Sequence, residues 1–214
     1  MKPDLLLRAG LEEASYLYNS QVGEAENYLV ARGIPLTVAM DYRLGVVTEP
    51  YSGSHNKYIG RLSIPYVTRA GVVTMRFRCL DPHDCKAVKC AKYLGIRATD
   101  VPLYNVNALF NKSDRLIITE GELDALVCSS LVGVPAVGCP GSNGWKPHFT
   151  RVVADFHTVV VVGDGDSAGR EMVKKLEEEL SNAVGIVLPD GHDINSLYME
   201  EGPAFVADLL NVGA

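Results

Sequence analysis

Residues 159–169, VVVVGDGDSAG, decide how the second half of the chain folds. Four consecutive valines favour a buried strand, because β-branched side chains pack well in a sheet that is covered on both faces. Glycines at 163 and 165 allow a sharp turn, and the apolar spacing after Ser167 is that of a helix. The stretch therefore predicts a strand, a tight turn that carries Asp164 and Asp166, and a helix.

The same alternation of strand and helix extends on both sides of this stretch. Segments of helical spacing separate short apolar runs, and these runs predict strands at 115–119, 134–138, 158–162 and 183–189. Near-continuous apolar strands between helices indicate a parallel sheet with helices on both faces. The sequence thus predicts an α/β fold with a parallel sheet of about four strands.

The first half of the chain follows a different pattern. Residues 1–45 have helical spacing, and 58–67 and 71–80 alternate like two antiparallel strands around a glycine-containing turn. Arg76 and Arg78 flank Phe77, so both arginines are expected on one face of their strand. We therefore predict a subdomain of helices and antiparallel strands ahead of the parallel sheet.

Charge is unevenly distributed between the two halves. Segment 57–97 holds nine lysines or arginines against two aspartates, a net charge of +7 in a chain whose total is −6. A basic segment beside an acidic one is typical of a protein that binds a phosphate polymer next to a metal site. Charged residues also simply solvate a surface, and charge alone leaves both interpretations open.

Length and composition bound the organisation of the chain. Its 214 residues suffice for one medium or two small domains, and we predict a basic subdomain at 1–110, a metal-binding domain at 111–200 and a C-terminal helix at 201–214. No apolar run approaches the roughly 20 residues of a membrane span. Five cysteines without framework spacing fit a reducing compartment. The expected location is the cytoplasm, without a membrane partner.

Acidic residues follow three of the predicted strands. Glu120 ends the first strand, Asp164 and Asp166 follow the third, and Asp193 lies in the loop after the fourth. Functional groups of open parallel sheets gather at the carboxyl ends of the strands, where clustered carboxylates repel one another unless a cation lies among them. Oxygen ligands favour Mg²⁺ or Mn²⁺, and two such ions could support phosphoryl transfer.

Three other interpretations of GDGDSAG compete with a metal site. A calcium-binding EF-hand loop begins similarly, but Ala168 and Lys175 stand where that loop needs ligands, and a strand precedes it in place of a helix. A dinucleotide-binding turn would place two negative charges beside a pyrophosphate. A helix cap would be favoured for an isolated pair of aspartates, and Glu120 on a second strand makes it less so.

Three motifs of the second half together resemble the Toprim fold, the metal-binding domain shared by bacterial-type primases, type IA and II topoisomerases and some nucleases. The motifs are EGELDAL at 120–126, VVVVGDGDSAGREMV at 159–173 and GHDINSLY at 191–198. The resemblance implies that Glu120, Asp164 and Asp166 are catalytic. It also implies that these three acids, with Asp124 and Asp193, hold the metal ions.

The upstream segment resembles the RNA-polymerase domain of DnaG-type primases. YLVARGIPLTVAMDYRLGVV at 28–47 is similar to the opening of that domain, and the predicted hairpin with AKYLG at 91–95 is similar to its basic subdomain. The resemblance covers about residues 20–200. It implies that four basic residues and one tyrosine contact nucleic acid or nucleotide. These residues are Arg61, Arg76, Arg78, Lys92 and Tyr93.

The chain departs from this family in three respects. Asn195 stands where many bacterial primases have a second aspartate, and neither the N-terminal zinc ribbon nor the C-terminal helicase-docking domain is recognisable. The expected partners are therefore a separate zinc-ribbon protein or replicative helicase, besides single-stranded DNA template and ribonucleoside triphosphates. Such compact cores resemble those encoded by bacteriophages, which would place the protein in the cytoplasm of a host cell.

Two further patterns in the sequence suggest other binding sites: a group of cysteines with a histidine, and a single tryptophan in a loop. CLDPHDCKAVKC at 79–90 gathers Cys79, His83, Cys85 and Cys90, but it lacks the two C-x₂₋₄-C pairs separated by a long central loop that are typical of structural zinc sites, so we expect no zinc there. Trp145, in CPGSNGWKPH, could stack on a base, although a tryptophan beside glycine and proline more often packs a loop.

The resemblance implies a catalytic core that makes short RNA primers on single-stranded DNA during replication. The reaction would be nucleotidyl transfer with two or more Mg²⁺ or Mn²⁺ ions. Two alternatives stay open: a non-catalytic Toprim protein that binds DNA and mediates repair, and a Toprim nuclease with similar acids. A topoisomerase is not expected, since no DNA-gate domain or nucleophilic-tyrosine context accompanies the motifs.

Overall fold

The computed structural model describes residues 5–96, 101–141 and 144–211, and the chain forms two compact units, Met1–Asp100 and Val101–Ala214. This division precedes the boundary expected at 110/111, because apolar side chains of the short helix η3 (Val106–Phe110) join the core of the second unit. Arg97, the last cation of the predicted basic segment, lies outside the described residues.

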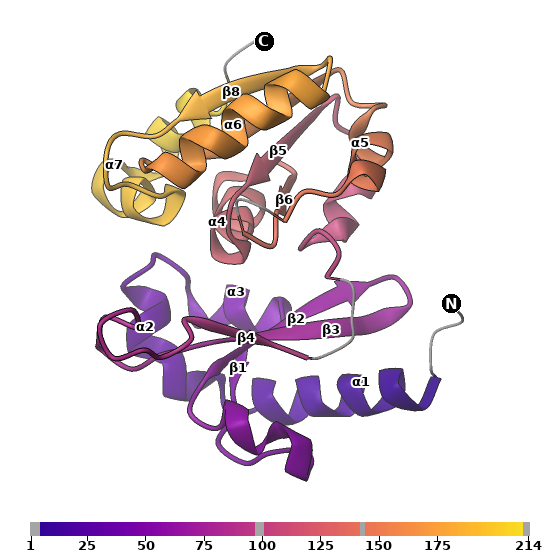
Figure 1. Cartoon of the computed structure of the whole chain (residues 1–214), viewed down its shortest axis with the longest axis vertical. Coiled ribbons are helices and arrows are strands. Elements are labelled where there is room, and N and C mark those ends of the chain that lie inside the picture. The colour runs from indigo at the N-terminus through magenta and orange to yellow at the C-terminus, as the bar shows by residue number, and fades with distance from the viewer. Residues whose placement is uncertain (1–4, 97–100, 142–143, 212–214) are drawn as a thin grey trace. The chain divides into compact units, whose positions relative to one another are not determined.

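The first unit is built on a four-stranded antiparallel sheet in the order β1-β2-β3-β4 (Figure 1). Its strands are β1 (Gly45–Val46), β2 (Leu62–Thr68), β3 (Gly71–Arg78) and β4 (Tyr93–Gly95). The predicted hairpin is confirmed as β2 and β3, whose register places Thr68 opposite Gly71 at the turn. Burial alternates along the end of β3, with Arg76 and Arg78 half-buried and Phe77 between them fully buried.

Helices pack around this sheet. They are α1 (Leu5–Asn19), α2 (Glu26–Val30) and α3 (Leu36–Asp41), with the 3-10 helices η1 (Val22–Ala25) and η2 (Gly53–Tyr58). The α1 residues in the core recur every three or four positions, as an amphipathic helix requires; they are Leu11, Ala14 and Tyr18. Tyr58 of η2 stacks on Phe77 of β3 with ring centroids 3.7 Å apart, which adds aromatic contact to this core.

The second unit contains a four-stranded parallel sheet in the order β6-β5-β7-β8. Its strands are β5 (Arg115–Thr119), β6 (Ala136–Gly138), β7 (Thr158–Gly163) and β8 (Ala183–Val187). Every residue of β7 is buried, as its four valines indicate. The predicted parallel sheet of about four strands is confirmed.

Helices lie on both faces of the parallel sheet, as predicted. They are α4 (Glu122–Val127), which continues into the π-helical turn η4 (Cys128–Val132), α5 (Pro147–Val153), α6 (Ser167–Glu179) and α7 (Ile194–Leu209). Connections between parallel strands of one sheet are right-handed, and this handedness determines the face of the sheet on which each connecting helix lies. The step from β5 through α4 to β6 moves toward one edge of the sheet, and the step from β7 through α6 to β8 moves toward the other, so α4 and α6 lie on opposite faces. The hydrophobic core is in agreement with this placement. Among the described residues, side chains of α5 and α6 form one apolar cluster with β5 and β7, and no α4 side chain belongs to that cluster.

The last helix closes the second unit. A kink at Gly202 and Pro203 divides α7, so the helix predicted at 201–214 is its second part, and residues 212–214 lie outside the described residues. Arg115 Nη1 donates a hydrogen bond to the carbonyl oxygen of Leu210 at 2.9 Å, which brings the end of α7 beside the start of β5. None of the described helices combines the length and apolar character needed to cross a membrane.

The loops after β7 and β8 are held together through a glycine. Gly165 N–H donates a hydrogen bond to the carbonyl oxygen of His192 at 2.8 Å. A Cβ on Gly165 would lie 1.8 Å from the carbonyl oxygen of Pro189, so only glycine allows this close approach.

We expect Gly165→Ala to lower the unfolding free energy of the second unit by about 1–3 kcal/mol, the usual cost of forcing an extra carbon into a packed site. Trp145, the single tryptophan of the chain, is 5% exposed in this unit, so its fluorescence during urea unfolding reports the change. Gly23→Ala is the matched control, since a Cβ there meets no atom within 4 Å. An unchanged unfolding midpoint for Gly165→Ala would contradict the close contact.

Candidate metal-binding edge and basic face

Two acids follow the neighbouring central strands of the parallel sheet. β5 pairs directly with β7, and the last paired residues are Thr119 and Val162. Glu120 therefore follows β5 at the level of Gly163, the last residue of β7, and Asp164 comes directly after it. The structure thus places Glu120 and Asp164 on the carboxyl edge of the sheet, where parallel folds collect their functional groups.

Asp166 caps the helix that leaves this edge. Its Oδ1 accepts a hydrogen bond from Gly169 N–H at 2.8 Å, and its backbone is extended, as at a helix N-cap. Asp164 is half-buried, whereas Asp166 is exposed. A cap uses one carboxylate oxygen, so the same side chain can hold a cation with the other.

Asp124 and Asp193, the other acids of the predicted set, have hydrogen-bonding roles at the start of α7. Asp124 is 7% exposed, and its Oδ1 accepts a hydrogen bond from Asn195 N–H at 3.3 Å. Asp193 Oδ1 accepts from Ser196 N–H at 2.8 Å, while Asp193 N–H donates to Ser196 Oγ, which completes a capping box. Both carboxylates therefore position α7, a role that the sequence pattern does not show.

Negative charge at this edge affects two buried thiols. Burial, together with the charge of Glu120, raises the pKa of the Cys139 thiol to about 12. Burial also raises the pKa of Cys128 above its usual range, and the charge of Asp124 adds to this effect. Both cysteines therefore stay protonated and serve as apolar core side chains.

The donor set at the edge suits a hard divalent cation. Carboxylate oxygens are the ligands that Mg²⁺ and Mn²⁺ prefer. Within the described residues, no three of these acids bring their oxygen atoms within 4.8 Å of one another. Mg²⁺ usually keeps several water ligands in proteins, so carboxylates at this spacing fit an ion that is held partly through water.

Glu122 is an acid of the EGELDAL motif that sequence reasoning does not single out. It opens α4 and is only 1% exposed, and all six residues of that helix are buried. A signal is present, because Glu122 shares a helix face with the apolar residues Ala125 and Leu126, three and four positions later. The EGELDAL motif therefore contributes a buried acid in addition to Glu120 and Asp124.

One aromatic ring joins two of the predicted cationic residues of the first unit. The guanidinium carbons of Arg76 and Arg78 lie 4.3 and 5.3 Å from the centre of the Tyr93 ring, and Arg78 Nη1 donates to Tyr93 Oη at 2.6 Å. Pairing of β3 with β4 brings them together, since Arg78 is opposite Tyr93. Cation–π contact holds each charge in place without neutralising it. We call Arg76, Arg78 and Tyr93 the basic face.

The remaining predicted cations belong to the same unit. Arg61 Nη1 donates to the carbonyl oxygen of Ala91 at 2.8 Å, so its side chain reaches the segment before β4. Lys92 is exposed and lines one pocket with Arg78 and Tyr28. The structure therefore connects Lys92 to the basic face through a shared pocket.

Tyr28 is a further residue of this pocket that the sequence does not single out. The guanidinium carbons of Arg32 and Arg78 lie 5.0 and 5.4 Å from the centre of its ring. Arg32 is four positions after Tyr28 and gives a local signal for an aromatic–cation contact. The contact with Arg78 depends on the fold of the unit.

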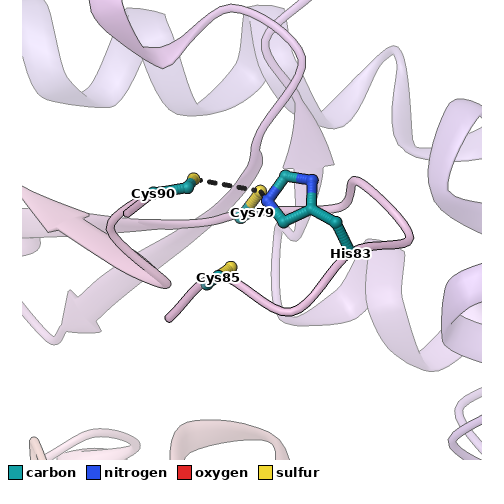
Figure 2. Close-up of side chains that lie close together, drawn as sticks. All are labelled: Cys79, His83, Cys85 and Cys90. Atoms are coloured by element: carbon teal, nitrogen blue, oxygen red, sulfur yellow. Dashed lines mark hydrogen bonds between the residues drawn. The ribbon is translucent and has the colours of Figure 1, made fainter. Parts of the chain in front are cut away.

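Four potential metal ligands meet in the loop between β3 and β4. The Sγ atoms of Cys79, Cys85 and Cys90 and a ring nitrogen of His83 all lie within 4.8 Å of one another (Figure 2). The expectation of no zinc relied on the spacing of these residues along the chain. In the folded loop the four ligand atoms meet although their spacing along the chain is irregular, so spacing no longer speaks against zinc.

Trp145 packs inside the second unit. It is 5% exposed, its ring meets Phe149 edge-on with centroids 5.5 Å apart, and its Nε1 donates to Thr150 Oγ1 at 3.4 Å. Loop packing, which the sequence favours over stacking on a base, is therefore confirmed.

Known proteins are similar to this chain in sequence. The Toprim domain family matches residues 115–204. The gene 57 protein of Mycobacterium phage D29 is 39% identical over 150 residues, which cover 68% of this chain and 94% of that protein. The DNA primase of Pseudomonas putida is 31% identical over 115 residues, which cover 50% of this chain and 17% of the primase.

The RNA polymerase domain of the Mycobacterium tuberculosis primase DnaG is similar in structure. It superposes with a TM-score of 0.80 at 23% identity, over 99% of this chain and 84% of that domain. The same domain in complex with double-stranded DNA gives a TM-score of 0.77. The chain therefore belongs to the family of the phage D29 gene 57 protein, and it combines a Toprim domain with the fold of the DnaG-type primase catalytic core. The expected α/β Toprim fold, preceded by a subdomain with an antiparallel sheet, is confirmed.

Asp166→Asn and Asp166→Ala separate the capping role of Asp166 from its charge. Asparagine caps helices as well as aspartate does, whereas alanine lacks the acceptor and costs about 1 kcal/mol. We expect Asp166→Ala to lower the unfolding free energy of the second unit by that amount, and Asp166→Asn to remain close to the parent protein. Urea unfolding followed by Trp145 fluorescence measures both, and equal loss in the two variants would contradict the capping role.

Proposed function

We propose that this chain is a DNA primase catalytic core, which synthesises short RNA primers on single-stranded DNA by Mg²⁺- or Mn²⁺-dependent nucleotidyl transfer. The observation that carries the proposal is the placement of Glu120 and Asp164 after the adjacent strands β5 and β7, in a chain with the fold of primase cores. Two carboxylates at one edge, joined by Asp166 on the following helix, suit divalent ions and phosphate chemistry.

The basic face supports a nucleic-acid partner. Arg76 and Arg78 are held on the Tyr93 ring, and Lys92, the residue before Tyr93, is exposed. Ordered cations of this kind bind phosphates with little loss of side-chain freedom. The related domain of the Mycobacterium tuberculosis primase has been solved with DNA, which is consistent with template binding by this chain.

The acids would have different roles in the reaction. Bound ions would activate the attacking hydroxyl and neutralise the leaving pyrophosphate. Asp164 and Asp166 are the main ligands in this proposal, and Asp124 and Asp193 complete the metal-binding set. Glu120, which follows β5, accepts the proton of the primer 3′-hydroxyl.

Incorporation of labelled ribonucleotides on single-stranded DNA by the purified protein tests this function. Products that grow only when ribonucleoside triphosphates and a divalent ion are present would support it. Loss of DNA without nucleotides would indicate a nuclease, and binding without either reaction a non-catalytic mediator. Adding a zinc-ribbon protein or a replicative helicase to the assay tests whether a partner chooses the start site.

Asp164→Asn should reduce primer synthesis by at least about 100-fold, because it removes a charge that holds the ions without changing the size of the side chain. Asp190→Asn is the matched control: Asp190 lies on the loop after β8, is exposed and pairs with Arg170 at 3.1 Å. Rates are compared with Mg²⁺ and with Mn²⁺. Parent-like synthesis by Asp164→Asn with both ions would refute the proposed mechanism.

Lys92→Ala should weaken binding of single-stranded DNA and flatten its salt dependence. Loss of one phosphate contact lowers the slope of log K against log salt by about 0.7 for a single strand. Fluorescence anisotropy at several salt concentrations measures the slope. Lys174→Ala is the control, since this exposed lysine of α6 lies among Glu171, Glu177 and Glu178 and should leave the slope unchanged.

A further inference from the structure

The loop between β3 and β4 collects three cysteines and a histidine that primer synthesis does not use. Cys90 Sγ lies 3.7 Å from Cys79 Sγ, and Cys79 Sγ lies 3.8 Å from His83 Nε2. With Cys85, all four ligand atoms fall within 4.8 Å of one another. Figure 2 shows the three sulfur atoms and the imidazole ring turned toward one small space.

The separations of Cys79 from Cys90 and from His83 are close to those of tetrahedral zinc. Bonds of about 2.3 Å to sulfur and about 2.0 Å to nitrogen place two sulfur ligands about 3.8 Å apart, and a sulfur and a nitrogen about 3.5 Å apart. A disulfide requires sulfur atoms about 2.05 Å apart. Cys79 and Cys90 are well beyond that distance, and all five cysteines of the chain are free. Three thiolates and one imidazole are a usual ligand set for structural zinc.

The loop has no apolar core of its own. No residue from Leu80 to Lys92 is buried, and Val88 is 56% exposed. Backbone hydrogen bonds turn the chain, and one of them, from Cys90 N–H to the carbonyl oxygen of Cys85 at 2.8 Å, brings two of the cysteines together. Segments that cannot bury apolar surface commonly depend on a metal for their order.

Charged neighbours complement the cluster. Zn²⁺ with three thiolates and a neutral imidazole carries one net negative charge, and Arg61 Nη2 lies 3.4 Å from Cys90 Sγ. On the other side of the imidazole, His83 Nδ1 lies 4.0 Å from Asp81 Oδ2. This distance is too long for a hydrogen bond, and the same oxygen lies 3.6 Å from Cys79 Sγ; a small movement of Asp81 would let it accept the Nδ1–H bond that orients histidine ligands of metal sites.

We infer that Cys79, His83, Cys85 and Cys90 form a structural zinc site, C-x₃-H-x-C-x₄-C, that orders the loop between β3 and β4. Four protein ligands leave no open position for water, so the ion supports the fold and does no chemistry. Lys86 and Lys89 lie inside this loop and Lys92 ends it, so the ion also holds part of the basic segment in place. The site belongs to the first unit, and its test does not depend on primer synthesis.

Metal analysis of the purified full chain tests the inference directly. Protein produced with added zinc and dialysed into metal-free buffer should retain one zinc per chain. Co²⁺ in its place should give the intense visible bands of a tetrahedral complex and a thiolate-to-cobalt charge-transfer band in the near ultraviolet. A chain with reduced thiols that retains no stoichiometric zinc would overturn the inference, as would the weak spectrum of octahedral cobalt.

Single substitutions identify the ligands. Cys85→Ser and Cys90→Ser should lose the zinc, whereas His83→Cys should keep it and gain charge-transfer intensity with Co²⁺, because four cysteines also form a structural zinc set. Cys128→Ala, at a buried thiol of the second unit, is the matched control and should retain one zinc. Retention of a full equivalent by Cys85→Ser, or its loss from Cys128→Ala, would refute the assignment.

Proteolysis gives a second readout that does not depend on spectra. Lys86 and Lys89 are exposed trypsin sites inside the loop, so the chelator-treated chain should be cut there faster than the zinc-loaded chain. Equal rates would contradict an ordering role. Mass spectrometry of the unreduced, alkylated protein checks for a disulfide within the loop, whose presence would also overturn the inference.

Discussion

The second unit depends on the burial of β5 and β7 at the centre of its sheet. Helices cover both faces, so alternation of polar and apolar side chains cannot set the register of these strands. Contacts at the strand ends set it instead: a Cβ on Gly163 would lie 2.3 Å from the carbonyl oxygen of Gly169, so the first turn of α6 packs on the end of β7 only because residue 163 is a glycine. Glu120 and Asp164 lie just beyond the last buried residues, and their place on the edge follows from this register.

Polar groups at the edge serve the fold as well as the proposed chemistry. Asp166 and Asp193 start α6 and α7, and Asp124 connects α4 to α7 through Asn195 N–H. A carboxylate has two oxygens, so one can bond to the backbone while the other binds an ion. Asn195, which stands where the resemblance to bacterial primases leads us to expect an acid, is 2% exposed and contributes its backbone to this arrangement.

The sequence predicts those features whose signals are local. The valines before GDGD and the glycines after them specify β7 and its turn, and the alternation around the hairpin specifies β2 and β3. β1 and β4 are only two and three residues long, so no periodic pattern reveals them, and they form because β2 and β3 offer edges to pair with. The cluster in the loop after β3 escapes prediction for a related reason. Its ligands meet through a turn in which Lys89 adopts a φ of 55°, and linear spacing does not encode that turn.

The hydrogen bond from Arg115 to the carbonyl oxygen of Leu210 means that the start of β5 and the end of α7 lie side by side. These two residues also enclose the segment that matches the Toprim domain. A domain whose two ends meet can be inserted into a longer polypeptide, or removed from it, while the flanking chain continues with little change of path. Such portability offers a physical reason why one metal-binding fold has been incorporated into primases, topoisomerases and nucleases of otherwise different architecture.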